Sequence, residues 1–281
     1  LISVFALSLI AACDPAVTTA PPAASGPVEL VQTWQAHGLT DPEGIAHAGG
    51  VLLVSNVAGE ASEKDGQGWI SRLGMDGRML EVEWVTGLNA PKGMAVRDGI
   101  LFVADIDAYH TIDVETGLIL NTFQVQDAVF LNDVALWQGG VYAADSGTAS
   151  IYQLDENGSK RWLHDDRLAG VNGLLSDGDD LLATTMDEGL LVRITGAGEI
   201  TELASGMRNA DGLARLDDGR FLVSSWPGKV WQVDTDGTAR ALLDTEADGI
   251  LQNDLTRIDD LIIIPNWKPG TVTAWRVGSA G

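Results

Sequence analysis

The sequence predicts an all-β fold, a six-bladed β-propeller made of four-stranded antiparallel blades. Three observations support this prediction. A strand–turn–strand pattern occurs six times at a spacing of about forty residues, and no stretch carries apolar residues at helical spacing between helix caps. The last repeat also lacks a fourth strand, which the N-terminal segment could supply. The length of 281 residues suits one large all-β domain or two ordinary ones, and the 33 glycines indicate many turns.

The six repeats begin with similar short strands, at residues 42–48, 91–97, 131–137, 171–177, 210–216 and 252–258. A Gly- or Asp-bearing turn follows in most units, and then an apolar second strand such as ILFVAD or VYAAD. The equivalent positions 44, 93, 133, 173, 212 and 254 lie 49, 40, 40, 39 and 42 residues apart, which fits one blade per repeat. The longer first interval contains residues 60–68, which we interpret as an inserted surface loop.

The two ends of the domain are predicted to meet. The last repeat ends with a third strand at residues 271–277, whereas residues 28–34 form a strand that has no blade of its own. Pairing these two strands would close the ring and remove the exposed edges of an open array. We therefore expect the propeller to span residues 28–278, closed by its N-terminal strand.

The segment before the propeller has the character of an export signal. Residues 1–12 are uncharged and apolar, too short for a bilayer, which needs roughly 20 residues. Residues 10–13 resemble a bacterial lipobox, which implies cleavage before Cys13 and lipidation of that residue; the alternative is an ordinary signal peptide with an incidental cysteine. Residues 14–27 have linker composition. We expect a signal peptide at 1–13, a flexible linker, and a lipoprotein of the bacterial cell envelope that faces the periplasm or the exterior.

The net charge narrows the range of partners. Lys plus Arg total 17 against 40 Asp plus Glu, a net charge of −23. Such a surface repels phosphates, so the sequence argues against a nucleic-acid partner. The same charge favours solubility and tolerates divalent cations. We expect a monomer that contacts the membrane through its lipid anchor only.

Two sets of positions are predicted to face one mouth of the central channel, because the first strand of each blade lines that channel. The second residues of the six first-strand segments, at the entry to each strand, are Glu43, Lys92, Asn132, Asn172, Asp211 and Asn253. The ends of the second strands carry Asn56, Asp105, Asp145, Thr185, Trp226 and Trp267. The first set could alternatively be turn formers, because Asn-Gly and Asp-Gly favour tight turns. The two tryptophans could wall a pocket or pack between blades.

The first set, which we call the mouth ring, favours oxygen chemistry. It contains carboxylates, amides and one lysine but no His or Cys, so it suits hard cations such as Ca²⁺ or Mg²⁺ and argues against structural zinc. His110 is the only histidine that follows a second strand, and we expect it to be a polar loop residue. No G-x-S-x-G, G-x-G-x-x-G or P-loop motif is present in a suitable context.

At these residues the sequence resembles the SMP-30/gluconolactonase/LRE-like family of six-bladed β-propellers. PEGI, LND, VNGL and ADGLA carry the resemblance through their order and blade spacing over about residues 28–278. It implies one divalent metal bound by Glu43, Asn172 and Asp211, with Ca²⁺ favoured and Mg²⁺, Mn²⁺ or Zn²⁺ possible. It also implies hydrolysis of a small-molecule lactone or related ester: the metal polarises the carbonyl, Asp211 helps to deprotonate water, and Asn132 orients the substrate.

One departure from the family concerns substrate binding. The family's substrate arginine has no counterpart in DAVFLND, before Asn132. Lys92 could replace it by anchoring a polar or anionic substrate, or could instead pair with Glu43. We assign catalytic roles to Asp211 and Asn132. The residues assigned to substrate binding are Asn132, Lys92, Asn253, Trp226 and Trp267.

Two other functions fit the same sequence. The first is a non-catalytic binding propeller of the NHL or strictosidine-synthase-like type, whose rigid mouth holds a small ligand or a protein partner. The second is a structural envelope lipoprotein in which the mouth ring serves only stability.

Overall fold

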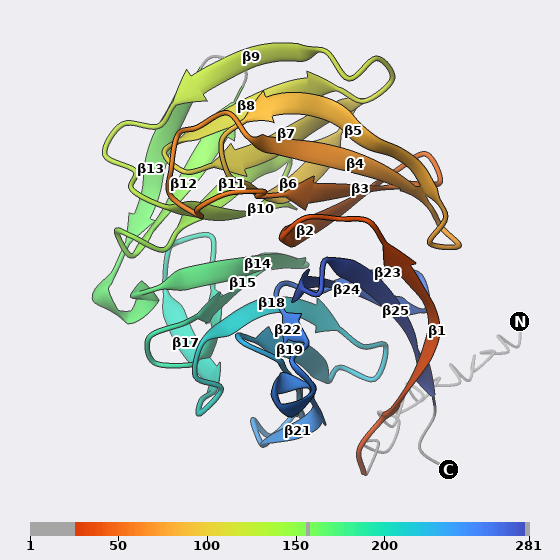
Figure 1. Cartoon of the computed structure of the whole chain (residues 1–281). Helices are drawn as coiled ribbons and strands as arrows, with labels where there is room; N and C mark the ends of the chain where they lie inside the picture. Colours follow the sequence, from red (N-terminus) through yellow and green to blue (C-terminus); the bar gives the residue numbers. More distant parts are fainter. Residues whose placement is uncertain (1–25, 156–157, 279–281) are drawn as a thin grey trace, which may run out of the picture.

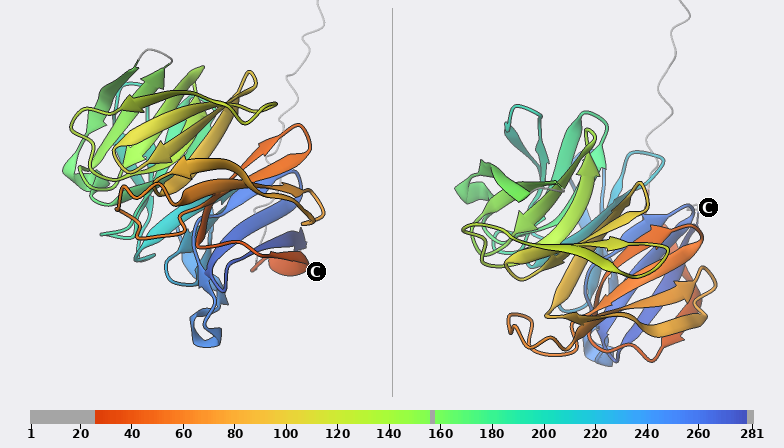
Figure 2. Two further views of the ribbon diagram at one scale, coloured as in Figure 1. Left: turned by 45° about the horizontal axis from the view of Figure 1, so that its top comes forward. Right: turned by 90° about the horizontal axis from the view of Figure 1, so that it is seen from above.

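The computed structural model describes residues 26–155 and 158–278. These residues form six antiparallel sheets arranged around a central axis (Figures 1 and 2), so the predicted six-bladed β-propeller is confirmed. The predicted signal peptide and Cys13 lie outside the described residues, and lipidation stays a prediction that metabolic labelling with palmitate would test. Within the described ranges the helices are the short 3-10 turns η1 (Asp166–Leu168) and η2 (Glu246–Asp248), and neither could cross a bilayer.

Each blade is a meander of consecutive strands, and the first strand of each lies innermost. Blade 1 contains β2 (Pro42–Ala48), β3 (Val51–Asn56), β4 (Gly68–Gly74) and β5 (Met79–Leu88). Blade 2 contains β6 (Pro91–Arg97), β7 (Ile100–Asp105), β8 (Ala108–Asp113) and β9 (Ile119–Gln124). Blade 3 contains β10 (Leu131–Trp137), β11 (Gly140–Asp145), β12 (Ser150–Asp155) and β13 (Gly158–His164).

The second half of the ring repeats this pattern, except that the innermost strand of the last blade is split. Blade 4 contains β14 (Val171–Asp177), β15 (Asp180–Thr185), β16 (Leu191–Ile194) and β17 (Ile200–Ala204). Blade 5 contains β18 (Ala210–Arg215), β19 (Phe221–Ser225), β20 (Lys229–Val233) and β21 (Ala239–Asp244). Blade 6 contains β22 (Leu251–Gln252), β23 (Thr256–Ile258), β24 (Leu261–Lys268), β25 (Thr271–Gly278) and β1 (Glu29–His37).

The ring closes through β1, which pairs antiparallel with β25 from Glu29 opposite Gly278 to His37 opposite Thr271. Figure 1 shows the red β1 alongside the blue β25. The predicted closure is therefore confirmed, although the strand extends three residues beyond the predicted end at Trp34. A buried hydrogen bond of 2.8 Å from the Val28 amide to Gln232 Oε1 also ties this segment to blade 5.

Two-residue turns join several of the strands, as the Gly-rich repeat suggests. Asp98 and Gly99 between β6 and β7 have φ values of 51° and 79°, and Gln138 and Gly139 between β10 and β11 have 47° and 75°. Positive φ at both central residues matches the right-handed twist of a hairpin. These short turns keep successive strands of a blade in register.

The hydrophobic core lies between blades rather than in one central mass. Between blades 1 and 2, for example, Leu53 and Ile70 pack with Met94 and Leu101. Equivalent clusters lie at the other blade interfaces, including the one between blades 6 and 1 that β1 helps to build. Burial of apolar surface between blades therefore holds the innermost strands in place.

Candidate functional site

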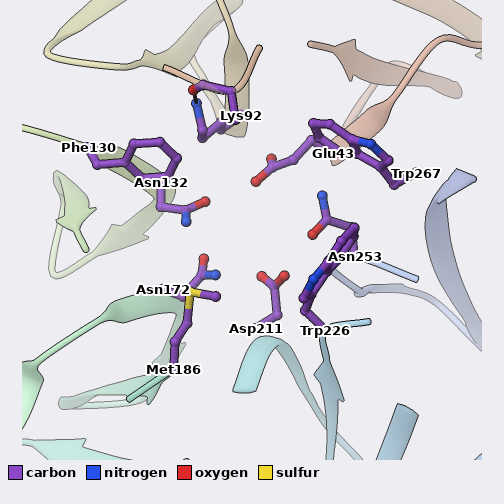
Figure 3. A pocket seen from close by; sticks show the side chains of 11 residues that line it. Glu43, Lys92, Phe130, Asn132, Asn172, Met186, Asp211, Trp226, Asn253 and Trp267 are labelled. Atoms are coloured by element: carbon purple, nitrogen blue, oxygen red, sulfur yellow. Dashed lines mark hydrogen bonds between the residues drawn. The ribbon is translucent and has the colours of Figure 1, made fainter. Parts of the chain in front are cut away.

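The mouth of the central channel is a single cavity of about 280 Å³ (Figure 3). Its lining comes from every blade and consists of Glu43, Ala61, Lys92, Phe130, Asn132, Asn172, Met186, Asp211, Trp226, Asn253 and Trp267. The structure thus brings together the whole mouth ring and both predicted tryptophans. Ala61 belongs to the segment interpreted as an inserted surface loop, so that loop also forms part of the cavity wall.

Polar side chains at the ends of the second strands hold the loops that lead into the mouth ring. Asn56 Oδ1 accepts a hydrogen bond of 3.0 Å from the Thr40 amide, three residues before Glu43. The Asp105 carboxylate accepts bonds of 2.9 and 2.7 Å from the amides of Asn89 and Ala90. Asp145 does the same for Val129 and Phe130, at 3.1 and 2.8 Å. These side chains position the mouth ring and do not line the cavity.

The expectation that Asn56, Asp105, Asp145, Thr185, Trp226 and Trp267 are equivalent residues facing the mouth is therefore wrong. The strand pairings that define the position are Pro42–Asn56, Pro91–Asp105, Leu131–Asp145, Val171–Thr185, Ala210–Ser225 and Gln252–Asn266. Trp226 and Trp267 come one residue later and are equivalent to Met186, which also lines the cavity. Successive side chains of a strand point to opposite sides, so the last residue of a second strand and the residue after it face different surroundings. The sequence repeat alone does not separate these two positions.

Glu43 and Asp211 are the two carboxylates of the mouth, and both are buried, with 6% and 3% of their surface exposed. Burial, followed by the charge of Asp211, raises the pKa of Glu43 well above its usual range, and Lys92 only partly opposes this. Burial and the charge of Asp133 raise the pKa of Asp211 to about 7. No hydrogen-bond donor within the described ranges offsets either carboxylate charge. The pair thus favours either protonation or an added cation.

Three amides face the same space as these carboxylates (Figure 3). Asn132 Nδ2 donates a hydrogen bond of 3.2 Å to Ser146 Oγ, which in turn donates to the Val171 carbonyl at 2.6 Å. This chain fixes the amide so that Oδ1 is the group available to the cavity. Asn172 and Asn253 extend from β14 and from the break between β22 and β23.

Lys92 is buried, and its ammonium group makes contacts within the protein. Nζ donates hydrogen bonds of 2.9 Å to the carbonyls of Ala61 and Ala90 and lies 4.4 Å from the centroid of the Phe130 ring. Burial lowers the pKa of Lys92, while Glu43 and Asp105 raise it. No ion pair within 4.0 Å joins Lys92 to Glu43 among the described side chains. Its clearest structural role is to attach the inserted loop to the mouth ring.

The two tryptophans meet at the boundary of blades 5 and 6, and both line the cavity. The ring centroids of Trp226 and Trp267 lie 6.1 Å apart with an interplanar angle of 86°, an edge-to-face contact. The choice between pocket wall and interblade packing is therefore resolved in favour of both. Trp267 also packs against the small apolar cluster of Val57, Ala90 and Ile106.

Two further carboxylates, Asp133 and Asp254, lie along the channel and were not identified from the sequence. They come directly after Asn132 and Asn253, in blades 3 and 6, and line a second cavity of about 80 Å³. Burial raises the pKa of Asp133 to about 7, against the hydrogen bonds that it accepts from the Leu174 and Val134 amides. Burial and then the charges of Asp133, Asp211 and Glu43 raise the pKa of Asp254 well above its usual range.

A sequence signal for these two residues was present. The equivalent position is Gly in the other four repeats, as Gly44, Gly93, Gly173 and Gly212. The channel is narrow there: a Cβ on Gly93 would lie 2.4 Å from Asp133 Cα, and one on Gly212 would lie 1.8 Å from Asp254 Oδ1. Glycine is needed at these positions for close approach, and Asp in place of Gly at two opposite blades marks a channel-facing group.

His110 does not reach the mouth, and the expectation of a polar loop residue is wrong. It lies within β8 and is buried. Its Nε2 is 2.9 Å from Asp105 Oδ2 and its Nδ1 is 2.8 Å from Thr122 Oγ1. The ring therefore supports Asp105, which in turn holds the loop before Lys92.

The donors of the mouth fit a hard divalent cation. Two carboxylates and three amides converge on one space, and none of the cavity residues is His or Cys. No group of three or more His, Cys, Asp or Glu side chains in the described ranges is arranged as a metal cluster. A cation at the mouth would therefore depend on Glu43 and Asp211 together with amide oxygens, as in sites for calcium.

The fold and the site together define a six-bladed β-propeller with a polar and aromatic pocket at one mouth of its channel. No protein-family model and no curated protein sequence matches the chain. Among solved structures, a gluconolactonase from Xanthomonas campestris is similar, with a TM-score of 0.63, 16% identity, and coverage of 93% of this chain and 99% of that chain. Regucalcin, a calcium-binding protein from Agrobacterium tumefaciens, gives a TM-score of 0.63 and 16% identity, covering 87% and 93%.

A third similar structure is virginiamycin B lyase from Staphylococcus aureus, with a TM-score of 0.63, 13% identity, and coverage of 88% of this chain and 99% of that chain. At such identities the likeness establishes the fold. The architecture that the resemblance to gluconolactonase-type propellers implied is thereby confirmed.

Proposed function

We propose that this propeller is a divalent-metal-dependent hydrolase that opens a lactone or a related ester in its mouth pocket. The observation that carries this proposal is the convergence of the buried carboxylates of Glu43 and Asp211 with three amides in one cavity. Gluconolactonase and regucalcin, which share the fold, agree with a lactone substrate and with calcium, respectively.

The residues of the mouth have distinct roles in this proposal. Glu43, Asn172 and Asp211 hold the metal, which when bound supplies a Lewis acid that polarises the substrate carbonyl. Asp211 accepts a proton from the attacking water, and Asn132 and Asn253 orient the ester. The water oxygen forms a new bond to the acyl carbon, the ring C–O bond breaks, and the proton ends on the released oxygen. The product is a hydroxy acid.

Two other functions, a lyase and a non-catalytic binding protein, have less support from the residues of the mouth. The lyase that shares the fold has a catalytically inactive variant in which a histidine is replaced by alanine, whereas no histidine lines this mouth pocket. One observation favours a non-catalytic binding propeller: among the described residues, the only titratable side chains that line the cavity are two carboxylates and a lysine. Such a protein would bind a small ligand without hydrolysing it.

The test is metal-dependent hydrolysis. Metal-stripped full-length protein is assayed on a panel of lactones with Ca²⁺, Mg²⁺, Mn²⁺ or Zn²⁺, alongside Asp211→Asn and the control Asp179→Asn, which alters an exposed turn carboxylate. We expect activity only with added metal and a loss of about 100-fold or more in Asp211→Asn, the scale of losing one group that stabilises developing charge. Equal activity in the three proteins, or hydrolysis by none of them under any condition, would refute the proposal.

A further inference from the structure

The mouth pocket combines two kinds of lining. The carboxylates and amides of the mouth ring surround its centre, and the apolar side chains of Phe130, Met186, Trp226 and Trp267 lie beside them in blades 3 to 6 (Figure 3). Met186, Trp226 and Trp267 occupy equivalent positions, one residue beyond the end of the second strand. Three successive blades thus place a large apolar side chain at the same height of the mouth.

The tryptophan pair is ordered by contacts within the protein. Its edge-to-face geometry, with an interplanar angle of 86°, presents the two rings at right angles, which forms a corner. Aromatic rings in such arrangements hold flat or branched apolar groups through offset or edge contacts. A substituent that fills this corner would contact both indoles at once.

The pocket also lacks a cation that is free to bind a substrate anion. No arginine lines it, and the ammonium of Lys92 bonds the carbonyls of Ala61 and Ala90 and lies against Phe130. With a divalent cation bound, the charges of Glu43 and Asp211 are balanced, and no positive side chain among the described residues of the cavity remains free to attract a substrate anion. The pocket therefore favours a neutral substrate.

From these observations we infer that the substrate is a small neutral lactone or ester bearing an apolar or aromatic substituent, which lies against Trp226 and Trp267 while its ester group faces the carboxylates and amides. The inference rests on the proposed hydrolase function. Hydroxyl groups of a sugar lactone that lay against the two indole rings would find no hydrogen-bond acceptor there, so this corner favours an apolar substituent. The cavity volume of about 280 Å³ suits a small molecule.

The test compares three lactones, dihydrocoumarin, γ-butyrolactone and glucono-δ-lactone, on the full-length protein with Ca²⁺. Trp226→Ala and Trp267→Ala are assayed with the control Trp84→Ala, which removes an aromatic side chain from the outer strand β5. We expect the wild type to prefer dihydrocoumarin. In each pocket variant kcat/KM for dihydrocoumarin should fall about tenfold through KM, with less than about a threefold change for γ-butyrolactone.

A preference for glucono-δ-lactone would overturn the inference, as would equal losses on all three lactones in the pocket variants. If the wild type hydrolyses none of them with any metal, the proposed function fails, and equilibrium dialysis of dihydrocoumarin decides the inference separately. Binding to the wild type that weakens in Trp226→Ala but not in Trp84→Ala supports a pocket for neutral apolar ligands. Absence of binding, or equal binding by all three proteins, overturns it.

Discussion

At the residue scale, the chemistry of the channel depends on carboxylates that share a buried space. Glu43 and Asp211 face the mouth, whereas Asp133 and Asp254 lie further along the channel, and the pKa of each is raised. The mouth pair could be predicted because each begins a repeat with a recognisable turn sequence. The deeper pair follows the mouth residues by one position in the sequence. Whether such a residue faces the channel depends on the strand register and on the width of the channel, which turn sequences do not reveal.

These raised pKa values make stability depend on pH. A carboxyl whose pKa is higher in the folded state binds more protons there than in the unfolded chain, where its pKa is about 3.9. Stability therefore falls as pH rises from about 4 through the folded-state pKa, at about 1.4 kcal/mol for each unit of difference. For Asp133, whose pKa is raised to about 7, this window includes pH 5 to 7. The pKa of Asp254 is also raised well above its usual range, so its contribution falls in the same direction.

Asp254→Asn tests this dependence, because the amide can still accept the 2.7 Å hydrogen bond from the Leu255 amide. In the presence of EDTA, we expect the variant to lose less stability than the wild type between pH 5 and pH 8, by about 1 kcal/mol or more. Urea unfolding at each pH gives the measurement, and Asp179→Asn is the control. Parallel pH profiles for Asp254→Asn and wild type would show that the charge of Asp254 does not destabilise the folded state.

At the scale of elements, the innermost strands determine both the pocket and its limits. The repeats could be identified from the sequence because each blade keeps its strand lengths and turns. The split between β22 and β23 could not, because the same Asn-Asp pair lies within the continuous strand β10 of blade 3. The role of the inserted loop also required the structure, since its attachment to the mouth depends on the long side chain of Lys92 reaching Ala61.

Gly212→Ala tests the close approach of these strands. The added Cβ would lie 1.8 Å from Asp254 Oδ1 and 2.2 Å from the Leu255 amide nitrogen, so β18 must move away from blade 6. We expect a loss of about 1–3 kcal/mol in unfolding free energy, as for overpacked cores. Gly196→Ala is the matched control, because its nearest neighbour is the flexible Gln138 side chain at 3.4 Å. Equal stability of the two variants in urea would contradict the described geometry.

At the scale of the whole molecule, the ring is closed by two strands that lie far apart in the sequence, β1 and β25. This closure could be predicted from the sequence, because the last repeat lacks a fourth strand and residues 28–34 form a strand that belongs to no other blade. The interblade clusters explain why closure matters: without β1, the apolar surface between blades 6 and 1 would be exposed.

Deletion of residues 28–37 should therefore unfold the entire domain and not only blade 6. Circular dichroism and the thermal transition provide the measurement, with a chain beginning at residue 26 as the control that retains β1. We expect the deletion to abolish the cooperative transition, and a synthetic peptide of residues 26–37 to restore part of it. A folded domain of unchanged melting temperature after the deletion would show that closure is dispensable.

The central claim is that a divalent cation binds at the mouth between Glu43, Asn172 and Asp211. A crystal of the protein soaked in Mn²⁺, with diffraction recorded for anomalous scattering, tests it most directly. We expect one strong anomalous peak within bonding distance of these three side chains, and its loss in a Glu43→Gln crystal treated in the same way. A mouth without a peak, or a peak only beside Asp133 and Asp254, would contradict it.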